Sequence, residues 1–179
     1  MCALDLFEHG GYDATSVADL TAALGLTKSA LYHHFDSKSA ILDVAVSDAL
    51  DGLERVVDEA EAQHPLASDR LRAIIRGAVR VLTEKLASVT LLLRVRGNSD
   101  VETRALSRRR DFDQRVTAIV AAAQREGMIR ADVDAAVATR LIFGMINSVV
   151  EWYRPGGTVD PDELGEDILR VSLDGLQSR

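Results

Sequence analysis

Side chains that can bind phosphates and bases gather on one short predicted helix, residues 28–34. Its outer face would present five hydrogen-bonding side chains: Thr27, Lys28, Ser29, Tyr32 and His33. Such donors and hydroxyls suit the phosphates and base edges of DNA. Ser37 and Lys38 then begin the next helix, and a helix N-terminus with a lysine is well suited to bind a phosphate. The segment therefore predicts a contact with nucleic acid.

A tight turn positions this helix against the one before it. Thr15 or Ser16 caps a helix that ends near Leu24, and residues 24–27 turn the chain around Gly25. Apolar residues on both sides of the turn and small alanines allow a close contact. This is the geometry of a helix-turn-helix, in which the second helix enters the major groove. A purely structural corner of two helices is the alternative.

The adjacent histidines His33 and His34 could suggest a metal site. Neighbouring helical residues point about 100° apart, so the two imidazoles cannot share one ion. No Cys or acidic partner sits at ligand spacing, and Cys2 is the single cysteine. We therefore expect no metal and no cofactor, with His34 buried and hydrogen-bonded.

Two N-terminal runs resemble the opening of TetR-family repressors. They are LFEHGGYDATSVADL at residues 6–20 and LGLTKSALYHHFDSK at residues 24–38. The resemblance implies nine helices and a ligand-responsive DNA-binding repressor. By position it implies that Thr27, Lys28, Ser29, Tyr32 and His33 face DNA, while Thr15, Ser16 and Lys38 hold flanking phosphates.

The N-terminus departs from the family pattern, which usually includes a basic arm and a longer first helix. Lys28 and Lys38 are the only Lys or Arg residues among residues 1–45, against six acidic residues. We expect that Met1 is not the natural start. The alternatives are a weak DNA binder or a DNA-independent dimeric adaptor or ligand-binding protein.

Composition predicts an ordinary globular chain of 179 residues, with 47% apolar and 27% charged residues. The net charge of −7 argues against nonspecific coating of nucleic acid, but not against a small specific binding face. No apolar run approaches the roughly 20 residues of a membrane span, and no signal peptide is recognisable. We therefore expect a cytoplasmic protein.

Apolar spacing of three and four predicts an all-α fold. Nine helices are expected, at about residues 2–9, 16–24, 28–34, 38–62, 69–86, 91–95, 101–126, 134–153 and 161–176. The first three would form a helix-turn-helix DNA-binding domain, residues 1–45. Residues 46–179 would form the effector-binding and dimerisation domain.

The eighth and ninth predicted helices are expected to form a homodimer. Residues 141–153 are apolar nearly all round the helix, with Asn147, Ser148 and Glu151 as the polar exceptions. The ninth helix would add a second apolar stripe through Leu164, Ile168, Val171 and Leu176. Two chains would then build a four-helix interface. A buried central helix in a monomer is the alternative.

Residues 144–157 are similar to a TetR branch that often senses acyl-CoA or other lipid-derived ligands. A pocket for a small hydrophobic effector is expected between the fifth, seventh and eighth helices. Its expected lining is Leu82, Leu86, Leu92, Phe112, Val116, Phe143 and Asn147, although residues of this kind are more often plain core than ligand contacts.

Five arginines around the sixth and seventh helices could form a cationic mouth for a phosphate or carboxylate of the effector. They are Arg94, Arg96, Arg108, Arg109 and Arg110. The alternative, which we favour, is a solvated face paired with Glu102 and Asp111.

An enzyme is not expected. The sequence has no Gly-x-Ser-x-Gly elbow, phosphate loop, His-Glu-x-x-His motif or dinucleotide fingerprint. Gly10-Gly11 and Gly156-Gly157 are better explained as helix stops. The effector, the operator sequence, the regulated genes and the sign of regulation are not specified by the sequence.

Overall fold

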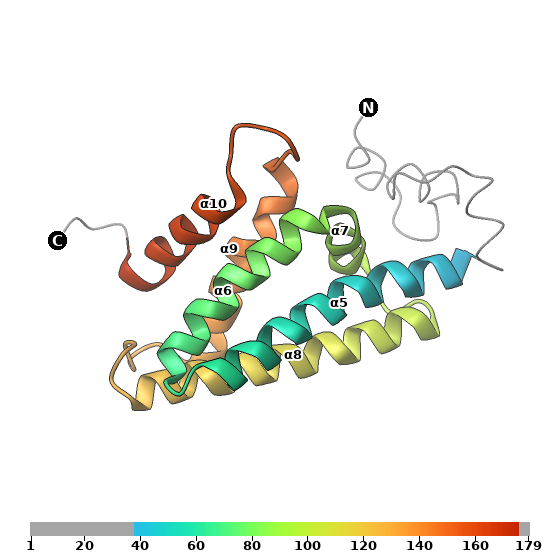
Figure 1. The fold of residues 1–179 in the computed structure, drawn as a ribbon. Coiled ribbons are helices and arrows are strands. Elements are labelled where there is room, and N and C mark those ends of the chain that lie inside the picture. Colours follow the sequence, from blue (N-terminus) through green and yellow to red (C-terminus); the bar gives the residue numbers. More distant parts are fainter. Residues whose placement is uncertain (1–37, 176–179) are drawn as a thin grey trace.

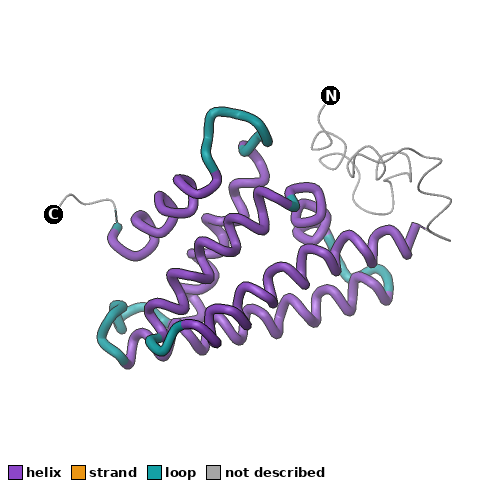
Figure 2. Tube along the Cα trace, in the orientation of Figure 1, coloured by secondary structure: helices purple, strands orange, loops and turns teal. Residues whose placement is uncertain are grey.

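The computed structural model describes residues 38–175, and these residues form six α-helices and one π-helical turn (Figure 1). The α-helices are α5 (Lys38–Gln63), α6 (Ala67–Glu84), α7 (Leu86–Arg94), α8 (Asp100–Arg125), α9 (Ala135–Trp152) and α10 (Pro161–Leu169). The π-helical turn η1 (Arg170–Asp174) follows α10 directly. Over these residues the chain has no strand (Figure 2).

All six helices expected beyond residue 37 are present, which confirms the all-helical class over the described range. The three expected N-terminal helices lie outside it. Two helix bounds differ most from expectation: α7 begins at Leu86 rather than near residue 91, and α10 ends at Leu169, with η1 after it, rather than near residue 176. None of the helices in this range is long and apolar enough to cross a bilayer.

Helix α6 forms the centre of the core. Its apolar residues at spacings of three and four, including Leu71, Ile74, Ile75 and Leu82, are at most 2% exposed. Helices α5, α8, α9 and α10 all pack against it. Burial on this scale is the main favourable term that holds such a bundle together.

Helices α5 and α8 are the two longest, at 26 residues each. They lie side by side and run in the same direction (Figure 1). Helix α10 packs on α6 at the opposite side of the molecule. The pair α5–α8 therefore forms a long rod on one flank of the core.

Side-chain caps fix the helix ends. Asp134 caps α9 by accepting hydrogen bonds from the backbone N–H groups of Ala136 and Val137, each at 3.0 Å. Asp160 caps α10 in the same way, with Pro161 in the first turn as expected. Helix α6 has no cap of its own. Glu126, after the end of α8, accepts hydrogen bonds from the N–H groups of Ala67 and Ser68 instead.

Gly77 allows α5 and α6 to approach closely. A Cβ atom at this position would lie 2.5 Å from Cγ1 and 2.8 Å from Cγ2 of Val56. Valine is short and stiff at χ1, so it cannot move aside without repacking. The close contact of the two helices therefore requires glycine at residue 77.

We predict that Gly77→Ala lowers the free energy of unfolding by about 1 kcal/mol. Overpacking costs about 1–3 kcal/mol, whereas alanine gains only about 1 kcal/mol in helix propensity. Denaturant unfolding measures the change. Adding Val56→Ala should make Gly77→Ala favourable, because the space is then free. Equal or higher stability for Gly77→Ala alone would disprove this account of the contact.

Candidate functional site

A cavity of about 690 Å³ opens between α7, α8 and α9, with one contact from Leu53 of α5. Such a volume is within the range of small-molecule sites. Its apolar lining comes from Leu53, Val89, Leu92, Leu93, Phe112, Ala118, Ala121, Ala136, Phe143 and Gly144. Its polar lining comes from Arg109, Arg110, Asp113, Gln114, Thr117, Thr139, Arg140 and Asn147.

Four of the seven expected effector residues line this cavity: Leu92, Phe112, Phe143 and Asn147. The other three do not. Leu82 and Val116 are buried in the main core, and Leu86 packs against that core. The expectation that the fifth predicted helix, α6, forms a wall is wrong. The apolar residues of α6 are buried against its neighbours, and α7 supplies that wall instead.

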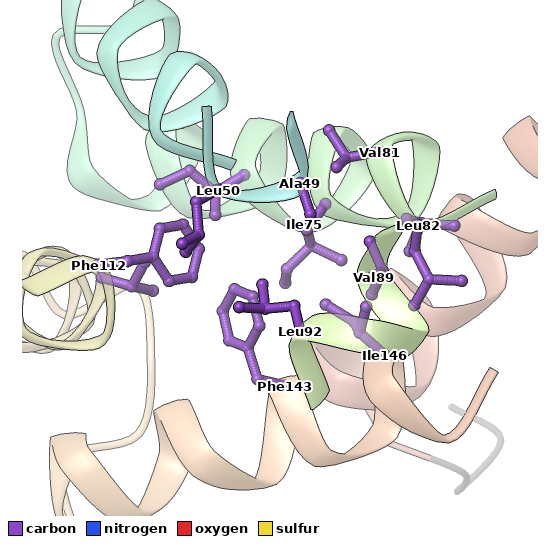
Figure 3. Close-up of a cluster of buried hydrophobic side chains, with 14 of the residues drawn as sticks. Ala49, Leu50, Ile75, Val81, Leu82, Val89, Leu92, Phe112, Phe143 and Ile146 are labelled. Atoms are coloured by element: carbon purple, nitrogen blue, oxygen red, sulfur yellow. The ribbon is translucent and has the colours of Figure 1, made fainter. Parts of the chain in front are cut away.

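Two aromatic rings form the apolar side of the cavity. Phe112 of α8 and Phe143 of α9 meet edge to face, with ring centroids 5.2 Å apart and an interplanar angle of 87°. Leu92 lies beside Phe143 (Figure 3). Edge-to-face contact is a favoured arrangement for aromatic pairs, so this side offers an apolar surface of packed rings to an apolar group.

The polar side carries charge from both α8 and α9. Arg109, Arg110 and Asp113 come from α8, and Arg140 comes from α9. Burial raises the pKa of the Asp113 carboxyl, while the positive charges of Arg109 and Arg140 act in the opposite direction. The cavity thus combines an apolar side with a positively charged one.

The opposite face of α8 is bound to α5 by a ladder of ion pairs, formed by Arg104, Arg108 and Arg115. Arg104 lies 3.3 Å from Asp43. Arg108 contacts Asp51 at 2.5 Å and Glu54 at 2.8 Å. Arg115 contacts Asp58 at 2.8 Å and Glu61 at 2.6 Å. The hydrogen bond to Glu54, more than that to Asp51, raises the pKa of Arg108.

The five-arginine cluster expected from the sequence is therefore divided. Arg108 belongs to the ladder, Arg94 lies 3.7 Å from Glu151, Arg96 is exposed, and Arg109 and Arg110 line the cavity. The expected pairing of these arginines with Glu102 and Asp111 is wrong. Glu102 is fully buried, and its Oε2 accepts hydrogen bonds from the backbone N–H groups of residues 96–98. Asp111 is exposed and forms no ion pair with residues 38–175.

An apolar stripe remains uncovered on α9. Val137, Leu141 and Trp152 are 44%, 66% and 48% exposed, and Gly144 and Ser148 lie between them on the same face. The apolar stripe expected on the ninth helix, α10, is not exposed in the same way as the stripe on α9. Leu164 and Ile168 of α10 are buried within the chain because α10 packs on α6. Val171 is partly buried, and Leu176 lies outside the described residues.

Two family models match the chain. Residues 2–45 match bacterial regulatory proteins of the tetR family. Residues 65–176 match the tetracyclin repressor-like C-terminal domain. The chain belongs to the TetR family.

Similar proteins agree with this assignment. A TetR-family regulator from Streptomyces coelicolor has 47% identity and a TM-score of 0.83, covering 98% of this chain and 89% of that one. PfmR from Thermus thermophilus has 32% identity and a TM-score of 0.76, covering 98% and 97%. The repressor KstR2 of Rhodococcus jostii is 29% identical over 98% of this chain and 88% of that protein.

This TetR-family chain is thus a DNA-binding transcriptional regulator. Seven of its predicted DNA contacts lie outside the described residues: Thr15, Ser16, Thr27, Lys28, Ser29, Tyr32 and His33. Lys38 is the first residue of α5, and only its backbone is described. Their roles stay predictions.

Sequence reasoning missed several residues that line the cavity of this TetR-family chain. Arg140 lies three residues before Phe143 and seven before Asn147, which places all three on one face of α9. Asp113 and Thr117 follow Arg109 at intervals of four on α8. The Thr117 hydroxyl lies 3.3 Å from that of Thr139 and joins the two helices. Helical spacing from the residues already chosen was the signal that could have found them.

Proposed function

We propose that this chain represses transcription as a homodimer and that a small amphiphilic effector releases it from operator DNA. The effector is an acyl-CoA or another lipid-derived molecule. Residues 1–45 bind the DNA, and residues 46–179 bind the effector and the second subunit. The chain acts without catalysis, in the cytoplasm.

The cavity is the observation that carries this proposal. Its edge-to-face phenylalanines offer an apolar surface, and its arginines offer a charged one, as an amphiphile requires. Its position in the half of the chain that matches the tetracyclin repressor-like C-terminal domain supports an effector site.

The path from cavity to DNA runs through α8 and α5. Helix α8 lines the cavity on one face and holds the ion-pair ladder to α5 on another. Helix α5 begins at Lys38, inside the N-terminal family match, so the same helix continues into the DNA-binding half. A change in the position of α8 would therefore move α5 and the segment attached to it.

Two states of the dimer are required. Paired recognition helices must lie about 34–36 Å apart to read successive turns of DNA. An effector shifts the equilibrium only through its different affinity for the two states. On the DNA-binding side we assign base and groove contacts to Thr27, Lys28, Ser29, Tyr32 and His33, and phosphate contacts to Thr15, Ser16 and Lys38.

We expect the full natural chain to bind duplex DNA from upstream of its own coding region, and octanoyl-CoA to weaken that binding by roughly 5–150-fold. Fluorescence anisotropy at low ionic strength measures both effects. Lys28→Ala with Tyr32→Ala should remove DNA binding and leave octanoyl-CoA binding intact. If the intact chain binds octanoyl-CoA but no duplex DNA, it is the ligand-binding adaptor and not a repressor.

The exposed stripe on α9 supports the homodimer. Its residues recur at spacings of three and four, and large exposed apolar side chains in a row mark a protein interface. Gly144 belongs to both the stripe and the cavity wall, and a Cβ atom there would meet nothing within 4 Å. We assign a second copy of α9 as its partner, with α10 flanking it.

Leu141→Glu should convert the dimer into a monomer, because it places a charge in the centre of the apolar stripe. We expect half the wild-type mass by light scattering and at least a roughly tenfold loss of operator affinity, since a monomer contacts one half-site only. Val159→Glu is the matched control, because Val159 is also exposed but lies outside α9. An unchanged dimer in Leu141→Glu would refute this interface.

A further inference from the structure

Positive charge is concentrated at the cavity of a chain that is acidic overall. The net charge of the whole chain is −7, yet the lining holds three arginines and one carboxylate. Arg109 and Arg110 reach it from α8, and Arg140 reaches it from α9. Arg110 and Arg140 are exposed and Arg109 is partly buried, so solvent moderates the repulsion between these positive charges.

The two cavity arginines of α8, Arg109 and Arg110, differ from three other arginines of that helix. Arg104, Arg108 and Arg115 all contact acids of α5 within 4 Å. Among residues 38–175, no acid lies within ion-pair distance of Arg109, Arg110 or Arg140. The same helix thus neutralises one row of arginines and leaves another row available to a ligand.

The arginines and two aromatic rings line the same cavity. Phe112 follows Arg109 and Arg110 on α8, and Phe143 lies three residues after Arg140 on α9. The two rings contact each other on the apolar side of the cavity (Figure 3). An anionic head and an apolar tail on one molecule would satisfy both sides at once.

The negative charge of Asp113 would repel such an anion. It lines the same cavity, and its carboxylate feels the charges of Arg109 from its own helix and Arg140 from α9. The remaining groups around it are apolar or neutral: Leu53 from α5, Val89, Leu92 and Leu93 from α7, and the hydroxyls of Thr117 and Thr139. Arg110 is the third positively charged group of the lining. A second negative charge would therefore compete with Asp113 for the same arginines.

We propose that the cavity selects an amphiphile with an oxyanion head, that Arg109 and Arg140 hold this head, and that Asp113 takes up a proton as it binds. This inference rests on the proposed effector site and specifies its chemistry. Asp113 is exposed in part to solvent, and the burial of the rest raises the pKa of its carboxyl, so protonation is easier there than for a fully solvated aspartate. The ligand's charge favours protonation further.

The sign of the pH dependence follows. The complex holds one proton more than the free protein and free ligand together, so affinity rises as pH falls. The slope is at most about tenfold per pH unit, within the range in which Asp113 is ionised in the free protein and protonated in the complex. Asparagine at residue 113 is neutral at every pH and should bind like the protonated acid.

Calorimetry with octane-1-sulfonate and 1-octanol tests this on the full chain. The sulfonate stays ionised at all relevant pH values, and the alcohol has the same tail without charge. We expect the sulfonate to bind the wild type more tightly as pH falls from about 8 to 5. Titrations in phosphate and Tris buffers should report proton uptake.

Three variants complete the experiment. Asp113→Asn should bind the sulfonate about tenfold more tightly at a pH of about 8 and lose the pH dependence. Asp111→Asn is the matched control, because Asp111 neighbours Phe112 but does not line the cavity, and it should resemble the wild type. Arg140→Met should bind the sulfonate at least about tenfold more weakly and bind octanol unchanged.

The outcomes separate this inference from the proposed function. Equal binding of sulfonate and octanol, or an unchanged pH dependence in Asp113→Asn, overturns the inference and leaves a hydrophobic effector site in place. Binding of neither probe to any variant overturns both. Octanoate and octanoyl-CoA distinguish the source of the oxyanion, because Arg140→Met should weaken whichever one presents its head group to α9.

Discussion

The parallel contact of α5 and α8, which combines buried apolar residues with the ion-pair ladder, is the constraint on which the rest of the arrangement depends. The two helices run in parallel, so their dipoles lie side by side with like ends together, which is mildly unfavourable. Arg104, Arg108 and Arg115 contact acids spaced along α5 from Asp43 to Glu61 and oppose this repulsion. Each exposed pair contributes little, about 0.2–1 kcal/mol. Together they fix the register of one helix on the other.

This register links two parts of the chain with different tasks. Helix α5 starts within the segment that matches the TetR DNA-binding domain, and α8 forms a wall of the cavity. Under the proposed function, a ligand that favours one position of α8 would influence DNA binding without contacting the DNA-binding segment. Glu102 adds a second constraint, because its buried carboxylate holds the loop between α7 and α8 through three backbone hydrogen bonds. Helix α8, which lines the cavity, is thus attached at defined points to α5 and to the loop after α7.

Much of the helical architecture could be predicted from sequence because its signals are local. The spacing of Leu71, Ile74, Ile75 and Leu82 identified the buried face of α6, and Asp160-Pro161 identified the start of α10. Contacts between distant segments could not be predicted in this way. Glu126 caps a helix that begins 59 residues earlier, and nothing near it in sequence indicates that partner.

For the cavity, too, the sequence predicted local features but not contacts between distant segments. Leu92, Phe112, Phe143 and Asn147 were found because they lie on apolar faces of predicted helices, but helical periodicity does not say which neighbour covers a face. It placed α6 in the wall, where the structure has α7, and it paired the stripe of α10 with a second chain, where the structure packs it on α6. The local sequence pattern predicts which residues are buried. The three-dimensional packing decides which helix covers them.

The central claim is that the cavity and the DNA-binding segment are coupled through α5 and α8. The most direct test measures a closed cycle: operator affinity with and without saturating octanoyl-CoA, and octanoyl-CoA affinity with and without operator. We expect both ratios to be equal, as linkage requires, and to fall together toward one when Arg104→Met, Arg108→Met and Arg115→Met together remove the ladder. Undiminished coupling in that folded variant would contradict the account.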